Sequence, residues 1–147
     1  MAGYSNMILT RTWKDKLRCL PQYLLGLIIR LVLKAEYDPK FNFKGRRVYR
    51  FKKGKFFSGT ALFDTYLPYT VGLKTIAHEH GHHIDGDRRG WLYLPTSGIK
   101  SLRNNLQSRT AGWNKKYYHT PPEDKADEDG GVRHTYCEGE YCVREYP

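Results

Sequence analysis

Residues 78–82 read His-Glu-His-Gly-His, which is an instance of the pattern H-E-x-x-H. Residues four apart lie on one face of an α-helix, so His78 and His82 can reach a single cation. Glu79, between them, can reach a water molecule beside that cation and act as a general base. The motif therefore requires a helix, and the surrounding apolar residues predict one over 70–85 that Gly86 terminates.

The same helix is predicted to have two distinct faces. At about 100° per residue, His78 and His82 project about 140° and 180° away from Leu73. His80 falls within an apolar stripe, so we interpret it as a core histidine with satisfied polar groups, and His83 as a supporting or surface group. A histidine-rich helix that binds nothing is the competing interpretation. The stripe consists of Leu73, Ile76, Ala77, His80 and Ile84.

A third ligand is expected from a later helix. The extension H-E-x-x-H-x-x-G-x-x-H is excluded, because Asp85 and Arg88 stand where it needs glycine and histidine. Glu123 and Asp127 lie four apart and so share a helix face. Glu123 can then bind a metal while Asp127 accepts a hydrogen bond from a ligand histidine and fixes its orientation.

Start and stop signals frame this second helix. Thr120 is the expected N-cap, followed by proline at the first helical position, and Gly130-Gly131 ends the helix. Glu123 would then complete a capping box, which is the alternative to its role as a ligand. Asp124, Asp127 and His119 are the fallback ligands.

The pattern His78-Glu79-x-x-His82 followed by Glu123-x-x-x-Asp127 resembles the gluzincin class of zinc metallopeptidases. Residues 47–132 are also similar to small H-E-x-G-H proteins of bacteria and their phages. The resemblance implies one Zn²⁺ bound by His78, His82 and Glu123, with Glu79 as catalytic base and Asp127 supporting a ligand. It also implies a compact zincin-like domain. For a site of this kind we expect a peptide or protein substrate.

Further parts of such a site can be assigned only as sets of candidates. An oxyanion stabiliser is expected, and Tyr117, Tyr118 and His119 all lie close in sequence to Glu123. A strand over 56–63 can pair with an extended peptide if it lies at the edge of its sheet.

Strands followed by helices predict an α+β fold. We divide the chain into a basic N-terminal helix and connector (1–46), the metallopeptidase domain (47–132) and a tail (133–147). In the first half of the chain we expect a helix over 13–35, a connector over 36–47, and strands over 47–52 and 56–63 joined by a turn at Lys53-Gly54. In the second half we expect a loop-rich stretch over 86–116 with one short helix. The tail over 132–147 is expected to form a hairpin or an extended strap.

The net charge of +10 resides in the first third of the chain. Residues 1–55 carry 14 basic and 3 acidic side chains, whereas residues 56–147 carry 11 and 12. This segment indicates an anionic partner (nucleic acid, a membrane surface or an acidic protein) or a solvated face. Basic and aromatic residues alternate from Arg46 to Phe57, which favours a half-buried strand over a phosphate-binding surface.

The apolar run 19–29 is shorter than the roughly 20 residues that span a bilayer. We expect a buried helix there, with an interfacial helix flanked by Arg18, Arg30 and Lys34 as the alternative. The N-terminus lacks a signal-peptide pattern and the chain has three cysteines, which favours a cytoplasmic location, at a membrane surface or in a phage particle. Cys137 and Cys142 suggest a second metal site or a hairpin disulfide.

The sequence thus supports two functions. The first is a zinc-dependent metallopeptidase in which Glu79 is the base. The second is a non-catalytic, zinc-stabilised binding or assembly module whose basic surface docks on nucleic acid or a membrane.

Overall fold

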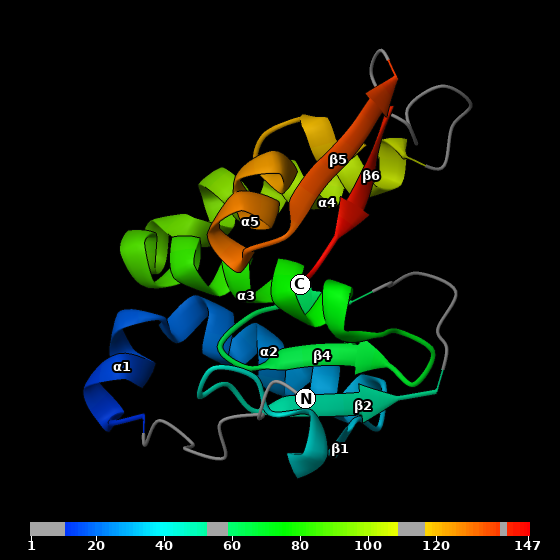
Figure 1. The fold of residues 1–147 in the computed structure, drawn as a ribbon. Helices are drawn as coiled ribbons and strands as arrows, with labels where there is room; N and C mark the ends of the chain where they lie inside the picture. The colour runs from blue at the N-terminus through cyan, green and yellow to red at the C-terminus, as the bar shows by residue number, and fades with distance from the viewer. Residues whose placement is uncertain (1–10, 53–58, 109–116, 139–140) are drawn as a thin grey trace.

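A four-stranded sheet lies between two helical layers in the computed structural model of this chain, which describes residues 11–52, 59–108, 117–138 and 141–147 (Figure 1). The strand order is β1-β2-β4-β3, with β2 and β4 parallel and the two outer pairs antiparallel. This mixed arrangement confirms the α+β class. The strands are β1 (Glu36–Tyr37), β2 (Val48–Phe51), β3 (Thr60–Ala61) and β4 (Thr65–Pro68).

One face of the sheet packs against helix α3 (Leu73–Arg89), which carries the H-E-x-x-H motif. Alternate strand residues point to opposite faces, so Val48 of β2 and Leu67 of β4 share this side. They meet Ile76 and Ala77 of α3, which are almost fully buried, so the core-facing stripe is confirmed at these two positions. The core consists of Phe43, Val48, Leu67, Ile76, Ala77 and Val132.

The other face of the sheet packs against helix α2 (Leu20–Val32). The approach is close, because a Cβ at Gly26 would lie 2.9 Å from the Tyr66 hydroxyl. Ile29 of α2 packs against this second core. Its buried members are Ala35, Tyr49, Phe51, Leu62 and Tyr66.

The predicted helix over 13–35 is in fact two helices. Helix α1 (Trp13–Arg18) begins at the N-cap Thr12, and α2 begins after a break at Cys19. Pro21 causes the break, because proline has no N–H and its ring clashes with the carbonyl four residues earlier.

The sheet contains two strands that the sequence did not predict. β1 lies in the expected connector, and β4 had no assignment. All four residues of β4 are buried, so it lacks the alternating pattern of a half-exposed strand. Pro68 also argues against a central strand, but β3 pairs only with Thr65 and Tyr66, so Pro68 lies beyond this ladder. Of the predicted strand 56–63, Thr60–Ala61 is observed; residues 56–58 and the predicted turn at 53–54 lie outside the described residues.

Helix α3 does not end at Gly86 as expected. It continues to Arg89 and ends at Gly90, whose positive φ of 55° is the conformation that glycine tolerates best. The stretch expected to be loop-rich is largely helical as far as it is described. It contains η2 (Gly90–Leu92), a π-helical turn (Leu94–Gly98) and α4 (Ile99–Gln107).

Helix α5 (Glu123–Gly130) begins later than predicted. Pro122 rather than Thr120 precedes the first helical residue, so Glu123 is not the third residue after a cap and the capping-box interpretation is wrong. The predicted end is confirmed, since Gly131 closes the helix with φ 82°. The tail forms the hairpin β5 (Arg133–Glu138) and β6 (Tyr141–Glu145), as one alternative predicted. Among the described residues, no helix has both the length and the apolar character needed to cross a bilayer.

Candidate metal centre

Helices α3 and α5 cross in direct backbone contact at two glycines. A Cβ at Gly81 would lie 1.9 Å from the Ala126 carbonyl oxygen, and a Cβ at Gly130 would lie 2.0 Å from the Ala77 carbonyl oxygen. Only glycine permits so close an approach. Helix α5 lies against α3 (Figure 1), and Glu123 at its start reaches both His78 and His82.

Three side chains converge where the two helices cross. Glu123 Oε2 lies 3.0 Å from His78 Nε2 and 3.1 Å from His82 Nε2. All three residues are buried, and their ligand atoms lie within 4.8 Å of one another. The predicted ligands His78, His82 and Glu123 therefore form a group that can hold a metal ion.

The hydrogen bonds of His78 place its two ring nitrogens against two carboxylates. His78 Nδ1 lies 2.7 Å from Asp127 Oδ1, as predicted from the spacing of Glu123 and Asp127. With Nδ1–H donating to Asp127, Nε2 presents a lone pair to Glu123 Oε2, another acceptor. Two acceptors 3.0 Å apart need a metal ion or a proton between them.

The pKa values of the same groups reflect these close contacts. Burial alone would lower the pKa of His78, but hydrogen bonds to Asp127 and Glu123 outweigh it and raise the pKa to about 9. Burial would raise the pKa of Glu123, yet the two histidines hold it well below its usual range. Glu123 Oε1 is buried without a hydrogen-bond partner among the described residues, which leaves an acceptor for a cation.

Two residues of the C-terminal hairpin anchor Asp127. Arg144 donates from Nε to Asp127 Oδ2 at 2.6 Å and from Nη2 to Oδ1 at 2.5 Å, and His134 Nε2 lies 2.6 Å from Oδ2. The sequence analysis assigned no such role to either residue. His134 and Arg144 are cross-strand partners in the hairpin, so only the strand register could have pointed to them.

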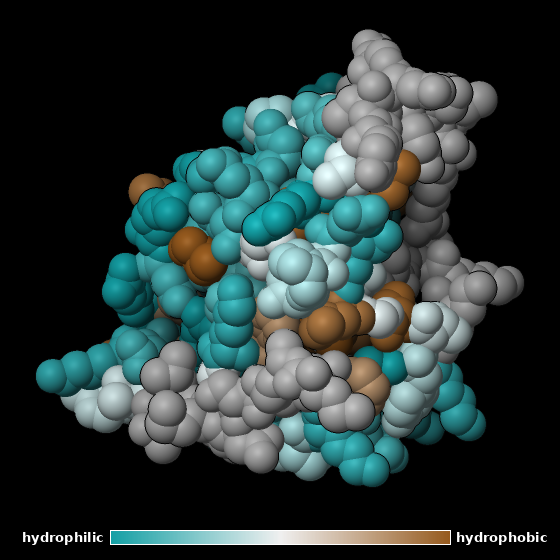
Figure 2. Space-filling model, in the orientation of Figure 1, coloured by the Kyte–Doolittle hydropathy of each residue, from teal (hydrophilic) through white to brown (hydrophobic). Residues whose placement is uncertain are grey.

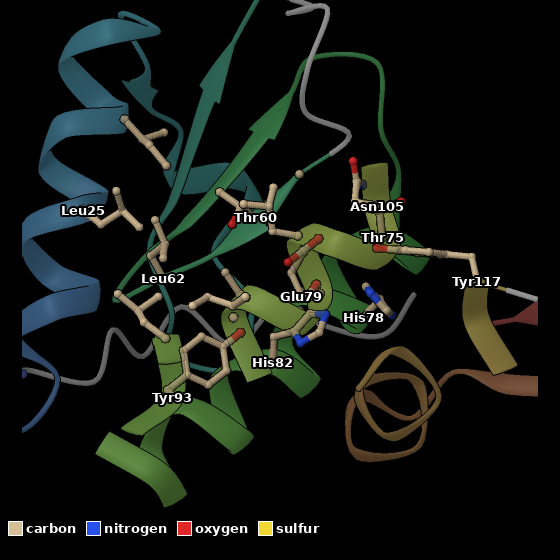
Figure 3. Close-up of a pocket in the computed structure, with 18 of the residues that line it drawn as sticks. Leu25, Thr60, Leu62, Thr75, His78, Glu79, His82, Tyr93, Asn105 and Tyr117 are labelled. Carbon is tan, nitrogen blue, oxygen red and sulfur yellow. The ribbon is translucent and has the colours of Figure 1, made fainter. Parts of the chain in front are cut away.

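A pocket of about 490 Å³ opens beside the metal group (Figure 3). Glu79 lies in this pocket with His78 and His82, and it is not a member of the metal group. Its carboxylate lies beside the start of strand β3, since a Cβ at Gly59 would lie 3.1 Å from Glu79 Oε1. Burial raises the pKa of Glu79.

The three oxyanion candidates occupy different surroundings. Tyr117 and Tyr118, in the turn η4 (Tyr117–His119), line the pocket, and the Tyr118 ring lies edge-on to His78 at 5.4 Å. His119 packs against the ring of His134 and is not among the residues that line the pocket. Burial raises the pKa of both tyrosines, so both are protonated hydrogen-bond donors at neutral pH.

The remaining histidines of α3 differ from their predicted roles. His83 is neither a supporting group nor exposed; it is buried and its Nε2 lies 2.7 Å from the Thr65 hydroxyl. His80 packs against the Phe43 ring, but its Nδ1 has no partner among the described residues, so it is not a satisfied core histidine. Burial lowers the pKa of His80 to about 4.

The fallback ligands do not join the metal group. Asp127 supports His78 instead, and Asp124 and His119 lie outside the group found among the described residues. The suggested second site or disulfide at Cys137 and Cys142 involves side chains outside the described part of the structure.

Comparisons with protein-family models, with curated proteins and with solved structures found no match for this chain. The functional argument therefore rests on the geometry of the metal group and of the pocket beside it.

Proposed function

We propose that this protein is a zinc-dependent hydrolase that cleaves peptide bonds. The position of Glu79 carries the proposal. This buried carboxylate shares the pocket with both ligand histidines but takes no part in the metal group. A structural metal site has no use for a free carboxylate at that point, whereas hydrolysis needs a base there.

The donor set supports zinc as the metal. Two imidazoles and one carboxylate are the ligands of one common kind of catalytic zinc site, and the group has no fourth member among the described residues. A zinc ion bound by His78, His82 and Glu123 would lower the pKa of a water molecule to about 7 and polarise the substrate carbonyl.

The chain's own residues supply the remaining steps. Glu79 accepts a proton from the attacking water while the water oxygen bonds to the carbonyl carbon. It then passes that proton to the amine nitrogen as the C–N bond breaks. Tyr117 and Tyr118 can donate hydrogen bonds to the oxygen on which negative charge develops. β3 lies at one edge of the sheet beside Glu79, where an extended peptide can add as a further strand.

The substitution Glu79→Gln tests this assignment. The amide cannot accept the proton, so hydrolysis of a peptide library should fall by about a hundredfold or more, while the zinc content measured by elemental analysis stays near one per chain. His82→Ala should lose both hydrolysis and the bound zinc, because it removes a ligand. Glu128→Gln, at an exposed position of α5, is the matched control and should change neither quantity.

Two results would contradict the proposal. Equal cleavage by wild type and Glu79→Gln, with zinc in both, would remove Glu79 from the mechanism. Stoichiometric zinc without cleavage of any library member would favour the zinc-stabilised binding module.

A further inference from the structure

Helix α2 turns an apolar stripe toward solvent. Leu24, Leu25, Ile28, Leu31 and Val32 recur at the spacing of a single helix face, and all five are exposed. Leu31 is 78% exposed, and the buried positions of the helix are Gln22 and Gly26. This outer face is the reverse of that of an ordinary surface helix, which is polar. Ile29, on the other side of α2, still packs on the core.

Helix α4 repeats this reversed pattern. Ile99, Leu102 and Leu106 lie on one face and are each more than half exposed. Asn104 is the buried residue of the helix and donates a hydrogen bond to the Pro121 carbonyl. We call the two outward stripes together, five residues on α2 and three on α4, the apolar rim.

The apolar rim borders the pocket of the metal centre at three of its eight residues. Leu25 of α2 and Ile99 and Leu102 of α4 belong to the rim and also line the pocket (Figure 3 labels Leu25). The surface over α3 and α5, in contrast, is mainly hydrophilic (Figure 2). Exposed apolar side chains of both α2 and α4 thus reach the pocket that leads to the metal group.

The charged side chains on α2 and α4 themselves are all basic. Arg18, Arg30 and Lys34 lie on or beside α2, and Lys100 and Arg103 lie on α4; all five are exposed. Neither helix contains an aspartate or a glutamate. Apolar side chains with basic residues at their borders are typical of helices that lie in the interface of an anionic bilayer.

We propose that the apolar rim docks on an anionic lipid bilayer, so that the pocket of the metal centre opens toward the membrane surface. Leucine and isoleucine side chains enter the headgroup region, and the basic side chains meet lipid phosphates. A second copy of the chain fits this surface poorly, because its rim would bring the same positive charges into contact. Nucleic acid fits poorly as well, since it offers no apolar surface for eight aliphatic side chains.

Co-sedimentation of the full chain with lipid vesicles tests the proposal. Wild type should bind phosphatidylcholine vesicles that contain phosphatidylglycerol, and added salt should weaken the binding. The double variant Ile28→Asn/Leu31→Asn should bind about tenfold more weakly or worse, because two apolar side chains no longer leave water. Lys100→Gln/Arg103→Gln should reduce the preference for vesicles that contain phosphatidylglycerol.

Val143→Asn is the matched control, because Val143 is an exposed apolar residue on β6, outside the rim. It should bind vesicles like wild type. Circular dichroism should show that all variants are folded, as expected for exposed positions.

Several outcomes would overturn the proposal. One is failure of wild type to bind any vesicle; another is unchanged binding by the double variant Ile28→Asn/Leu31→Asn. A dimer in analytical ultracentrifugation that this double variant dissociates, with no vesicle binding, would assign the rim to a second copy. Docking does not depend on hydrolysis, so Glu79→Gln should bind vesicles like wild type, and the two proposals can fail separately.

Discussion

The two walls of the pocket invert the usual distribution of side chains in opposite ways. The wall formed by α3 and the C-terminal hairpin, with α5 packed behind it, buries charged residues, including Glu79, Glu123 and Asp127. The wall built by α2 and α4 exposes aliphatic residues and buries Gln22 and Asn104. Charged residues are rarely buried unless they are paired, and large exposed apolar patches mark binding surfaces. Each inversion fits the contact that we propose for its wall: a metal ion on one side, and a membrane surface on the other.

The buried polar residues of the second wall have a structural task. Gln22 donates to the Gly90 carbonyl at 2.7 Å, and Asn104 donates to the Pro121 carbonyl at 3.1 Å. Both acceptors are backbone groups between helices, which would otherwise lose a hydrogen bond on burial. Asn104 also links α4 to the segment that leads into α5, so the two walls hold each other in place.

The largest effect should come from adding a side chain at the close contact between α3 and α5. Gly81→Ala would place a methyl group on the Ala126 carbonyl, so the helices must separate. We expect a loss of about 3 kcal/mol or more of unfolding free energy in denaturant titrations, together with loss of bound zinc. Gly86→Ala in the same helix meets only the Tyr93 ring at 3.8 Å. It should be neutral or stabilise by up to about 1 kcal/mol through better helix propensity. Similar destabilisation by both changes would show that the close contact at Gly81 is not the cause of the loss in stability.

Asp127→Asn should weaken metal binding without removing a ligand. The amide is a poorer acceptor for His78 and cannot pair with the Arg144 guanidinium as an anion. Zinc affinity should fall about 10- to 100-fold in competition with a chelating dye. Asp124→Asn, in the first turn of the same helix, should leave the affinity unchanged. Equal zinc affinity for Asp127→Asn and wild type would show that Asp127 does not support the metal site.

The smallest effect concerns the second wall and has an unusual sign. Asn104→Leu would make a buried position apolar, yet it should destabilise the protein by about 1 kcal/mol because the Pro121 carbonyl loses its donor. The reciprocal change Leu106→Asn, at an exposed position, should stay within about 0.5 kcal/mol. Thermal unfolding of the two variants measures both. A gain in stability from Asn104→Leu would show that this wall follows the ordinary rule, by which an apolar side chain at a buried position stabilises the fold.

The parts of the centre that depend on local spacing could be predicted from the sequence. His78 and His82 lie one helical turn apart, as do Glu123 and Asp127, so each pair shares a face once its helix forms. The prediction that the two pairs meet followed from the hypothesis that His78, His82 and Glu123 share one ion.

The features that depend on distant contacts could not be predicted in this way. Strand β4 is defined by its neighbours β2 and β3, and its four residues have no alternating pattern. Arg144 reaches Asp127 only through the register of the hairpin. The reversed pattern of α2 was interpreted as a buried helix, because the number of apolar residues does not show which face of the helix the sheet covers.

The anchoring of Asp127 by Arg144 also gives the metal centre an order of assembly. On the ribosome the two histidines emerge first, Glu123 and Asp127 follow, and Arg144 comes later still. At about 5–20 residues per second, several seconds separate the first ligand from the last anchor. Until then Asp127 lacks its guanidinium partner and His78 lacks a fixed orientation, so a nascent chain should hold a metal ion only weakly. Selective metal uptake would accordingly be one of the last steps in the maturation of this protein.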